Sequence, residues 1–290
     1  MAFTFQKHIR TPVLSGDFSQ LLMLPEIENG AYNPIFKDAH YMHKQSFFES
    51  IIENKHFALF GQRQKNMDQG LFLGTEVLLR VPTPSNPNIY LSTAYWIGFA
   101  EHIDKIEHLS LQILAQLIEN SDLLNAEYAP YYVNIPPPIV SVALVEYIKN
   151  LLDKADLPPN FIGIELTERQ PVTDPTSFRR GIDAFQRLSI PIALDDYGRG
   201  YATMQFLRDV PVNRVKIDQD LLHVAKTNKS QRLTLDSLLD FANAFDIEVI
   251  AEGVETEDDY AFVRKLGCDG MQGFYIDSPA MLIPIPSHLT

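Results

Sequence analysis

The sequence predicts a (β/α)8 barrel of the TIM type. Short apolar segments recur along the chain from Tyr131 onward, and each carries a polar residue near its end before a helical stretch follows. These polar residues are Asn134, Glu165, Asp195, Lys216, Glu252 and Gln272. Strand–helix units of about 20 to 36 residues are typical of a parallel barrel, whose active site forms at the C-terminal ends of the strands. A doubly wound open sheet is the alternative, but the sequence has no Gly-rich dinucleotide fingerprint to support it.

The composition indicates a globular protein with one large domain or two small ones. The 290 residues are 46% hydrophobic, which is enough for a full core without disulfides. The single Cys268 has no partner, which fits a reducing, cytoplasmic setting. No apolar run reaches the length of a membrane span and residues 1–20 lack a signal-peptide stretch, so we expect a soluble protein. The net charge of −13 argues against binding of long nucleic acid, but not against a small anionic substrate.

The first part of the chain supplies an extension and the opening elements of the barrel domain. Residues 1–40 are irregular, with scattered Pro, Gly and Asn, and we assign the barrel domain to residues 41–290. The apolar spacing of Tyr41–Glu53 predicts an amphipathic helix that packs on this domain. Strands are expected at Phe57–Phe60 and at Gly70–Val81.

The remaining elements follow in order. Pro82–Asn88 is rich in Pro and Asn and predicts a loop, and Ala94–Asn120 predicts a long helical region. Six strands are then expected at Tyr131–Ile135, Phe161–Thr167, Pro191–Asp196, Arg214–Asp218, Glu248–Glu252 and Met271–Ile276.

The stretch Pro191–Tyr201 is the most informative of these. It runs from apolar residues into Asp195 and Asp196 and then into a turn that contains Gly198 and Gly200. Side chains alternate along a strand, so adjacent carboxylates there are not expected to share one small cavity as plain bases. A divalent cation, or a pair of cations, explains them better. The alternative for this stretch alone is that one Asp caps the next helix and the other is solvated.

If the strand ends converge, they form an all-oxygen ligand set of five carboxylates and one amide: Glu76, Asn134, Glu165, Asp195, Asp196 and Glu252. Such a set favours Mg²⁺ or Mn²⁺ over zinc. The eight histidines, at positions 8, 40, 43, 56, 102, 108, 223 and 285, fall outside the strand ends and so do not suggest a zinc hydrolase.

Two cations bridged by one carboxylate, about 3.5–4 Å apart, have the geometry used for in-line attack on phosphate esters. Lys216 is then suited to orient the attacking water, and the planar fork of Arg80 to hold a phosphate. Taken singly, Glu165 could cap a helix, Lys216 could form a buried ion pair and Asn134 could serve a turn. A separate local role for each of six polar residues, all of them at strand ends, is less plausible than one site that they share.

The ordered motifs resemble the EAL-domain family of cyclic-di-GMP-specific phosphodiesterases, over roughly Phe57 to Pro279. The family's first motif reads TEVLLR here, with Glu76, Leu78 and Arg80 in place and Val77 where Ala is usual. The later blocks are YVNI, IELTE, LDDYGRGY, VKID, AEGVET and MQGF, in the family's order.

The resemblance implies a barrel that uses two Mg²⁺ or Mn²⁺ ions to hydrolyse cyclic di-GMP to linear pGpG. By this carry-over the six oxygen ligands bind the metals, Lys216 helps to activate the nucleophilic water, and Glu76, Glu252 and Glu255 complete the catalytic group. The residues implied to contact the dinucleotide are Gln62, Leu78, Arg80 and Gln272. Glu168 would anchor the loop after the Asp pair. A homodimer is also implied, and control of motility or biofilm formation is the family-level expectation.

The chain departs from the family pattern mainly in the loop after the Asp pair, where it has Tyr197, Arg199, Ala202 and Thr203. Arg199 is a large cation close to the expected metals, and we expect it to point to solvent. Val81 replaces the Trp that often follows the first motif. Two other functions stay open: a receptor that binds cyclic di-GMP without cutting it, and a different metal-dependent barrel enzyme that forms an enolate with a Lys base.

Overall fold

The computed structural model of the chain describes residues 39–67, 70–83, 86–90, 93–167, 170–198 and 204–286. Three expectations fall outside these ranges: the conformation of the N-terminal extension up to residue 38, the loop-anchoring role of Glu168, and the direction of Arg199.

Eight strands form a closed barrel, which confirms the predicted fold class. In barrel order they are β10 (Gly270–Met271), β9 (Glu248–Ala251), β8 (Arg214–Ile217), β7 (Ile192–Tyr197), β6 (Ile162–Leu166), β5 (Tyr131–Ile135), β2 (Phe72–Arg80) and β1 (Ala58–Asn66), and β1 pairs with β10 to close the ring. A further strand, β11 (Ala280–Ile283), pairs with β1.

One barrel strand is inverted. The other seven barrel strands, β2 and β5 to β10, run parallel to one another, whereas β1 is antiparallel to both of its neighbours, β2 and β10. Only a few residues separate Asn66 from Phe72, and a short connection permits an antiparallel hairpin but not a parallel crossover. The inversion places Gln62 of β1 directly opposite Glu76 of β2.

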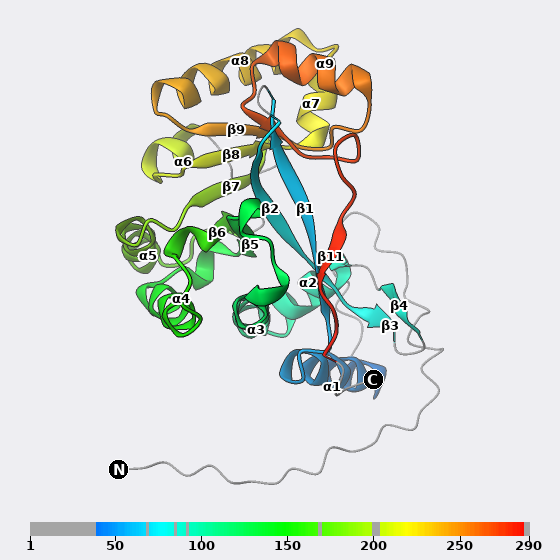
Figure 1. Cartoon of the computed structure of the whole chain (residues 1–290). Coiled ribbons are helices and arrows are strands. Elements are labelled where there is room, and N and C mark those ends of the chain that lie inside the picture. Colours follow the sequence, from blue (N-terminus) through cyan, green and yellow to red (C-terminus); the bar gives the residue numbers. More distant parts are fainter. Residues whose placement is uncertain are drawn as a thin grey trace.

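Helices cover the outside of the barrel (Figure 1). They are α1 (Ala39–Glu53), α2 (Thr93–His102), α3 (Ile106–Glu119), α4 (Val142–Lys154), α5 (Pro175–Arg187), α6 (Met204–Asp209), α7 (Gln219–Ala225), α8 (Lys229–Ala244) and α9 (Glu257–Leu266). Short 3-10 turns occur at Ser121–Leu123, Ala126–Tyr128, Pro137–Ile139 and Pro159–Phe161. None of the helices in the described ranges is long and apolar enough to cross a membrane.

Local sequence explains where several helices begin. Ser141, Asp174, Asn228 and Thr256 are N-caps whose side-chain oxygens accept backbone N–H groups of the first turn. Helix α9 has a full capping box, because Asp259 also accepts the backbone N–H of Thr256. These caps fix the direction in which each helix leaves the barrel.

Helix α1 packs on the main domain, as its apolar spacing predicts. Phe48 is buried, with its ring stacked 5.2 Å from that of Trp96 and edge-on to that of Phe99 at 5.6 Å. Aromatic pairs in these orientations add to the gain from burying their area. The helix therefore packs against α2 and α3 on the outside of the barrel (Figure 1).

Four predicted elements differ from the structure. The strand expected at Phe57–Phe60 is β1, which continues to Asn66 because its pairing with β2 extends to Lys65. The helical region Ala94–Asn120 is two helices, because Asp104 adopts a positive φ of 55° that interrupts the helix. The expected loop Pro82–Asn88 contains a small hairpin of β3 (Pro82–Thr83) and β4 (Asn86–Tyr90). The strand expected at Met271–Ile276 ends at Met271, because the chain turns at Gly273, where φ is 156°.

Candidate active site

The C-terminal ends of the parallel strands bring the predicted polar residues together. They are Glu76 on β2, Asn134 on β5, Glu165 on β6, Asp195 and Asp196 on β7, Lys216 on β8 and Glu252 directly after β9. The register of the strands aligns these residues with one another: Asn134 of β5, for example, lies directly beside Glu165 of β6. Residues separated by more than a hundred positions in sequence thus share one end of the barrel.

The ammonium group of Lys216 lies at the centre of this acidic cluster. Its Nζ atom is 2.5 Å from Glu252, 3.0 Å from Glu165, 3.0 Å from Asp195 and 3.1 Å from Glu76. The Lys216 and Glu165 side chains are fully buried, and the other three are largely so. One positive charge therefore faces four carboxylates in a medium that screens poorly.

The pKa values in this cluster reflect burial and the Lys216 charge. Burial alone would lower the pKa of Lys216, but the surrounding carboxylates, Asp195 first among them, raise it well above its usual value. Burial raises the pKa of Glu165 well above its usual value and that of Glu252 to about 8, although Lys216 opposes both shifts. For Glu76, burial is outweighed by Lys216 and by hydrogen bonds from Gln272, so its pKa is lowered. The crowded carboxylates thus disfavour one another's charged form, so Glu165 and Glu252 hold their protons to higher pH than isolated carboxyls do.

The two adjacent aspartates meet in one group despite the alternation of side chains along a strand. Ligand oxygens of Asp195, Asp196 and Glu252 lie within 4.8 Å of one another. Asp196 has a positive φ of 53°, and the pairing of β7 with β8 is irregular between Leu194 and Tyr197. This left-handed residue breaks the regular strand geometry, so the expectation from strict alternation does not hold. Strained backbone of this kind is frequent at functional sites.

Several buried carboxylate oxygens accept no hydrogen bond within the described part of the chain. These atoms are both oxygens of Glu165 and Oδ1 of Asp195, although Lys216 provides a charge contact to each residue. Buried carboxylate oxygens normally have a donor or a metal ion as partner. Together with the all-oxygen composition of the cluster, they fit a site for hard divalent cations such as Mg²⁺ or Mn²⁺.

Glu76 is held at both oxygens. Its Oε1 accepts a hydrogen bond from Asn134 Nδ2 at 3.2 Å, and its Oε2 accepts one from Gln272 Nε2 at 2.6 Å and one from Lys216 at 3.1 Å. Gln272 Nε2 also donates to Gln62 Oε1 at 3.1 Å. Gln272 therefore lies beside the acidic cluster, as its place at a strand end predicts, and Gln62 lies next to it.

Arg80 and Leu78 line a cavity of about 290 Å³ that opens from the acidic cluster. Its polar walls include Glu76, Asn134, Asp195 and Asp196, and its apolar walls come mainly from α2 and α3. Arg80 Nη1 donates to Leu79 O at 2.9 Å and to Thr93 Oγ1 at 3.2 Å, which holds the guanidinium at the cavity wall.

Glu255 stands apart from the other predicted catalytic residues. Its side chain is exposed, and its backbone N–H donates to Asp259 Oδ2 at 3.1 Å. Sequence reasoning also missed two buried polar residues, Gln64 and Arg214, which contact the site through Gln272. The signal was present, because Gln62 and Gln64, like Arg214 and Lys216, are two positions apart on one strand and so share a face.

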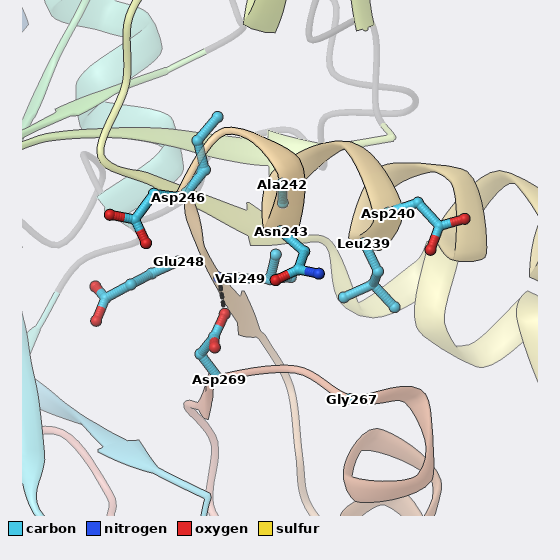
Figure 2. A pocket seen from close by; sticks show the side chains of 10 residues that line it. Leu239, Asp240, Ala242, Asn243, Asp246, Glu248, Val249, Gly267 and Asp269 are labelled. Atoms are coloured by element: carbon cyan, nitrogen blue, oxygen red, sulfur yellow. Dashed lines mark hydrogen bonds between the residues drawn. The ribbon is translucent and has the colours of Figure 1, made fainter.

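A second cavity, of about 300 Å³, lies near the C-terminal end of α8 and the start of β9 (Figure 2). Acidic side chains surround it: Asp240, Asp246, Glu248 and Asp269. Asp269 Oδ2 accepts the backbone N–H of Val249 at 2.8 Å, the contact drawn in Figure 2. This cavity is at the opposite end of β9 from Glu252.

The fold and the site define a closed α/β barrel whose buried acidic centre suits divalent cations. The chain belongs to the EAL domain family, whose model matches residues 45–279.

Three similar proteins illustrate this relationship. The "Signaling protein YkoW" of Bacillus subtilis is 27% identical over 84% of this chain and 30% of its own length. The "Cyclic di-GMP phosphodiesterase RocR" of Pseudomonas aeruginosa is 26% identical over 79% of this chain and 58% of its own length. A solved structure of the EAL enzyme Bd1971 in its cGMP-bound form has a TM-score of 0.71 and 26% identity over 83% of this chain and 68% of that one. The chain thus spans only part of these two curated relatives.

Proposed function

We propose that this protein hydrolyses cyclic di-GMP to linear pGpG. The observation that carries the proposal is the convergence of four largely buried carboxylates on Lys216 at the mouth of a cavity, with several of their oxygens accepting no hydrogen bond from the residues that the structure describes. A relative named as a cyclic di-GMP phosphodiesterase covers most of this chain, which supports the choice of substrate.

Divalent cations held here would supply positive charge at the phosphodiester and lower the cost of activating water. The residues proposed to hold two such ions, Mg²⁺ or Mn²⁺, are Glu76, Asn134, Glu165, Asp195, Asp196 and Glu252. Their donor set is oxygen alone, and the four carboxyl groups that contact Lys216 outnumber its single ammonium.

In this proposal Lys216 provides a counter-charge to the carboxylates and orients the attacking water. It has three N–H donors for four carboxylates, so not every contact is a full hydrogen bond. With cations bound to these carboxylates, Lys216 would have N–H donors available to orient the attacking water. The water oxygen then bonds to phosphorus, the bond from phosphorus to the 3′ oxygen breaks, and the departing oxygen takes up a proton.

Arg80, Leu78, Gln62 and Gln272 are proposed to bind the dinucleotide. Arg80 has its guanidinium at the cavity wall, where its planar fork of donors matches a phosphate group. Leu78 offers an apolar surface to a base or sugar. Glu255 is proposed to support the loop that follows β9, because its backbone is tied to the cap of α9.

The test is a chromatographic assay of purified protein with cyclic di-GMP in Mg²⁺, in Mn²⁺ and in EDTA. We expect pGpG to appear only with metal, and Glu76→Ala to abolish turnover while the fold is retained. Tight binding of the nucleotide without turnover in saturating metal would instead identify a receptor. Turnover by Glu76→Ala at the wild-type rate would refute the metal assignment.

We further propose that the protein is a cytoplasmic homodimer, as the family resemblance implies. Size-exclusion chromatography with light scattering tests the dimer, and a monomer at micromolar concentration would contradict it.

A further inference from the structure

A second layer of polar side chains lies inside the barrel, beneath the acidic cluster. Arg214 is two residues before Lys216 on β8, and Gln64 is two residues after Gln62 on β1, so each pair points to the same face of its strand. Arg214 is 2% exposed and Gln64 is fully buried. Buried polar groups of this size are costly unless they are hydrogen-bonded, which raises the question of what they hold.

The two residues form a chain of hydrogen bonds that ends at Glu76. Arg214 Nη1 donates to Gln64 Oε1, and Gln64 Nε2 donates to Gln272 Oε1 at 2.9 Å. Gln272 Nε2 in turn donates to Glu76 Oε2 at 2.6 Å. Its second N–H donates to Gln62 Oε1 at 3.1 Å.

The direction of this chain is fixed at both ends. A guanidinium has only donors, so the Gln64 atom that faces Arg214 must be its oxygen. The Gln64 N–H then requires an acceptor, which is the oxygen of Gln272. A carboxylate only accepts, so Glu76 requires the N–H side of the Gln272 amide. Neither glutamine can turn over without placing two donors or two acceptors against each other.

We propose that Gln64 and Arg214 are positioning residues of the active site. They hold the Gln272 amide with its N–H toward Glu76 Oε2, and this contact fixes the rotation of the Glu76 carboxylate. The other oxygen, Oε1, then stays on the side of Asn134, the neighbouring proposed ligand, where it would be available to a cation. The catalytic part of this inference rests on the proposed hydrolysis, whereas the expected Mn²⁺ affinity rests only on the proposed metal ligands.

Arg214 is itself held from several sides, which suits it to this role. Its Nε and Nη2 both donate to Glu248 Oε2, at 3.0 and 2.6 Å, and Nη2 also donates to Leu73 O at 2.9 Å. Its guanidinium lies 4.7 Å from the centre of the Tyr132 ring. Glu248 is 43% exposed and borders the second cavity (Figure 2), so the chain of contacts runs from that cavity to Glu76.

A glycine on β6 makes room for this arrangement. A Cβ atom at Gly163 would lie 2.4 Å from the ring of Tyr132, which is closer than carbon atoms approach each other. The Tyr132 ring therefore occupies space that any other residue at position 163 would take. Both cations of β8 thus act on one carboxylate: Lys216 directly and Arg214 through two glutamines.

The deciding variant is Gln64→Glu, which keeps the size of the side chain and its contact with Arg214. It replaces the donor that faces Gln272 by a carboxylate oxygen, so the Gln272 amide must turn over and present its oxygen to Glu76. We expect the affinity for Mn²⁺, measured by calorimetric titration without nucleotide, to fall about 10- to 100-fold, the usual effect of losing a partner behind a metal ligand. The kcat for cyclic di-GMP should fall by a similar factor.

A matched control is Gln116→Met, which alters another buried glutamine, one that donates to Phe57 O and does not contact the site. It should leave Mn²⁺ affinity unchanged even if it lowers the unfolding temperature. A purely structural role for Gln64 predicts the same for Gln64→Glu. A folded Gln64→Glu protein that binds Mn²⁺ as tightly as wild type would therefore overturn the proposal.

Gln64→Met serves if Gln64→Glu does not fold. It removes both hydrogen bonds of Gln64 without reversing the Gln272 amide, so we expect a smaller but measurable loss of Mn²⁺ affinity, and wild-type affinity would again overturn the proposal. Failure of the proposed function gives a different result from failure of the positioning role, because it is seen in the wild-type protein. Wild-type protein that binds Mn²⁺ but does not cut cyclic di-GMP refutes the phosphodiesterase, while a loss of affinity in Gln64→Glu still supports the positioning role.

Discussion

The ammonium group of Lys216 lies 3.0 Å from Oε1 of Glu165, and neither side chain is exposed to solvent. A fully buried pair of this kind is expensive to desolvate and is weak evidence for a purely stabilising role. Glu165 accepts no hydrogen bond within the part of the chain that the structure describes, so the pair is not fully satisfied. Both observations point to a site that is completed by cations.

Lys216→Met should destabilise the metal-free protein by about 3 kcal/mol or more, because it leaves the surrounding carboxylates without their counter-charge. Mn²⁺ should raise the unfolding temperature of this variant more than that of wild type, since the cation takes over part of that charge. Thermal unfolding with EDTA and with Mn²⁺ measures both effects. Lys149→Met, which breaks an exposed ion pair with Asp153, is the control and should change stability little. Equal responses of Lys216→Met and wild type to Mn²⁺ would contradict the prediction.

Glu165→Gln should separate stability from metal binding. The raised pKa of Glu165 shows that its charged form is disfavoured by burial, so the neutral amide should leave the metal-free protein as stable as wild type or more stable. Mn²⁺ stabilisation should be largely lost, and hydrolysis should fall on the order of 10²-fold. Unfolding curves with and without Mn²⁺ test this, with the exposed Glu119→Gln as control. Retained Mn²⁺ stabilisation would exclude Glu165 as a ligand.

Arg80→Lys should raise KM for cyclic di-GMP about tenfold or more, with a smaller effect on kcat. A lysine ammonium is a point donor and does not reproduce the planar fork that matches a phosphate. Steady-state kinetics in saturating Mn²⁺ measures the two parameters separately. Arg232→Lys, on α8 in an ion pair with Asp236, should leave both unchanged. If kcat falls while KM does not change, Arg80 acts on the reacting centre rather than on substrate binding.

Asp259→Asn should make the protein less stable at neutral pH by about 1 kcal/mol, as expected for the loss of a helix cap. Burial alone would raise the pKa of Asp259, but hydrogen bonds from Lys226, Thr256 and the backbone outweigh it and lower the pKa. A depressed folded pKa contributes stability that is present above the unfolded value of about 3.9 and is lost as the pH falls through the folded value. Wild type and variant should therefore converge in acid. Urea unfolding at a series of pH values tests this, and a constant difference down to the most acidic pH would contradict it.

The sequence was sufficient for the class of fold and for predicting which polar residues meet at one end of the barrel. Regular strand–helix spacing and a polar residue near each strand end predict a parallel barrel, and the structure places Glu76, Asn134, Glu165 and Glu252 around Lys216 accordingly. This works because the C-terminal ends of parallel strands meet at one edge, so order along the chain determines which residues converge.

Only the tertiary structure decided how these groups are oriented. The sequence does not reveal that Asp196 has a positive φ, so strand alternation wrongly separates it from Asp195. Nor does it show that Gln64 and Arg214 meet, because hydrogen bonds between β1 and β8 depend on how the barrel closes. The alternation of apolar and polar residues in the sequence indicates which face of a strand a residue occupies. Backbone torsions and contacts across the barrel, in contrast, arise only when all strands pack together.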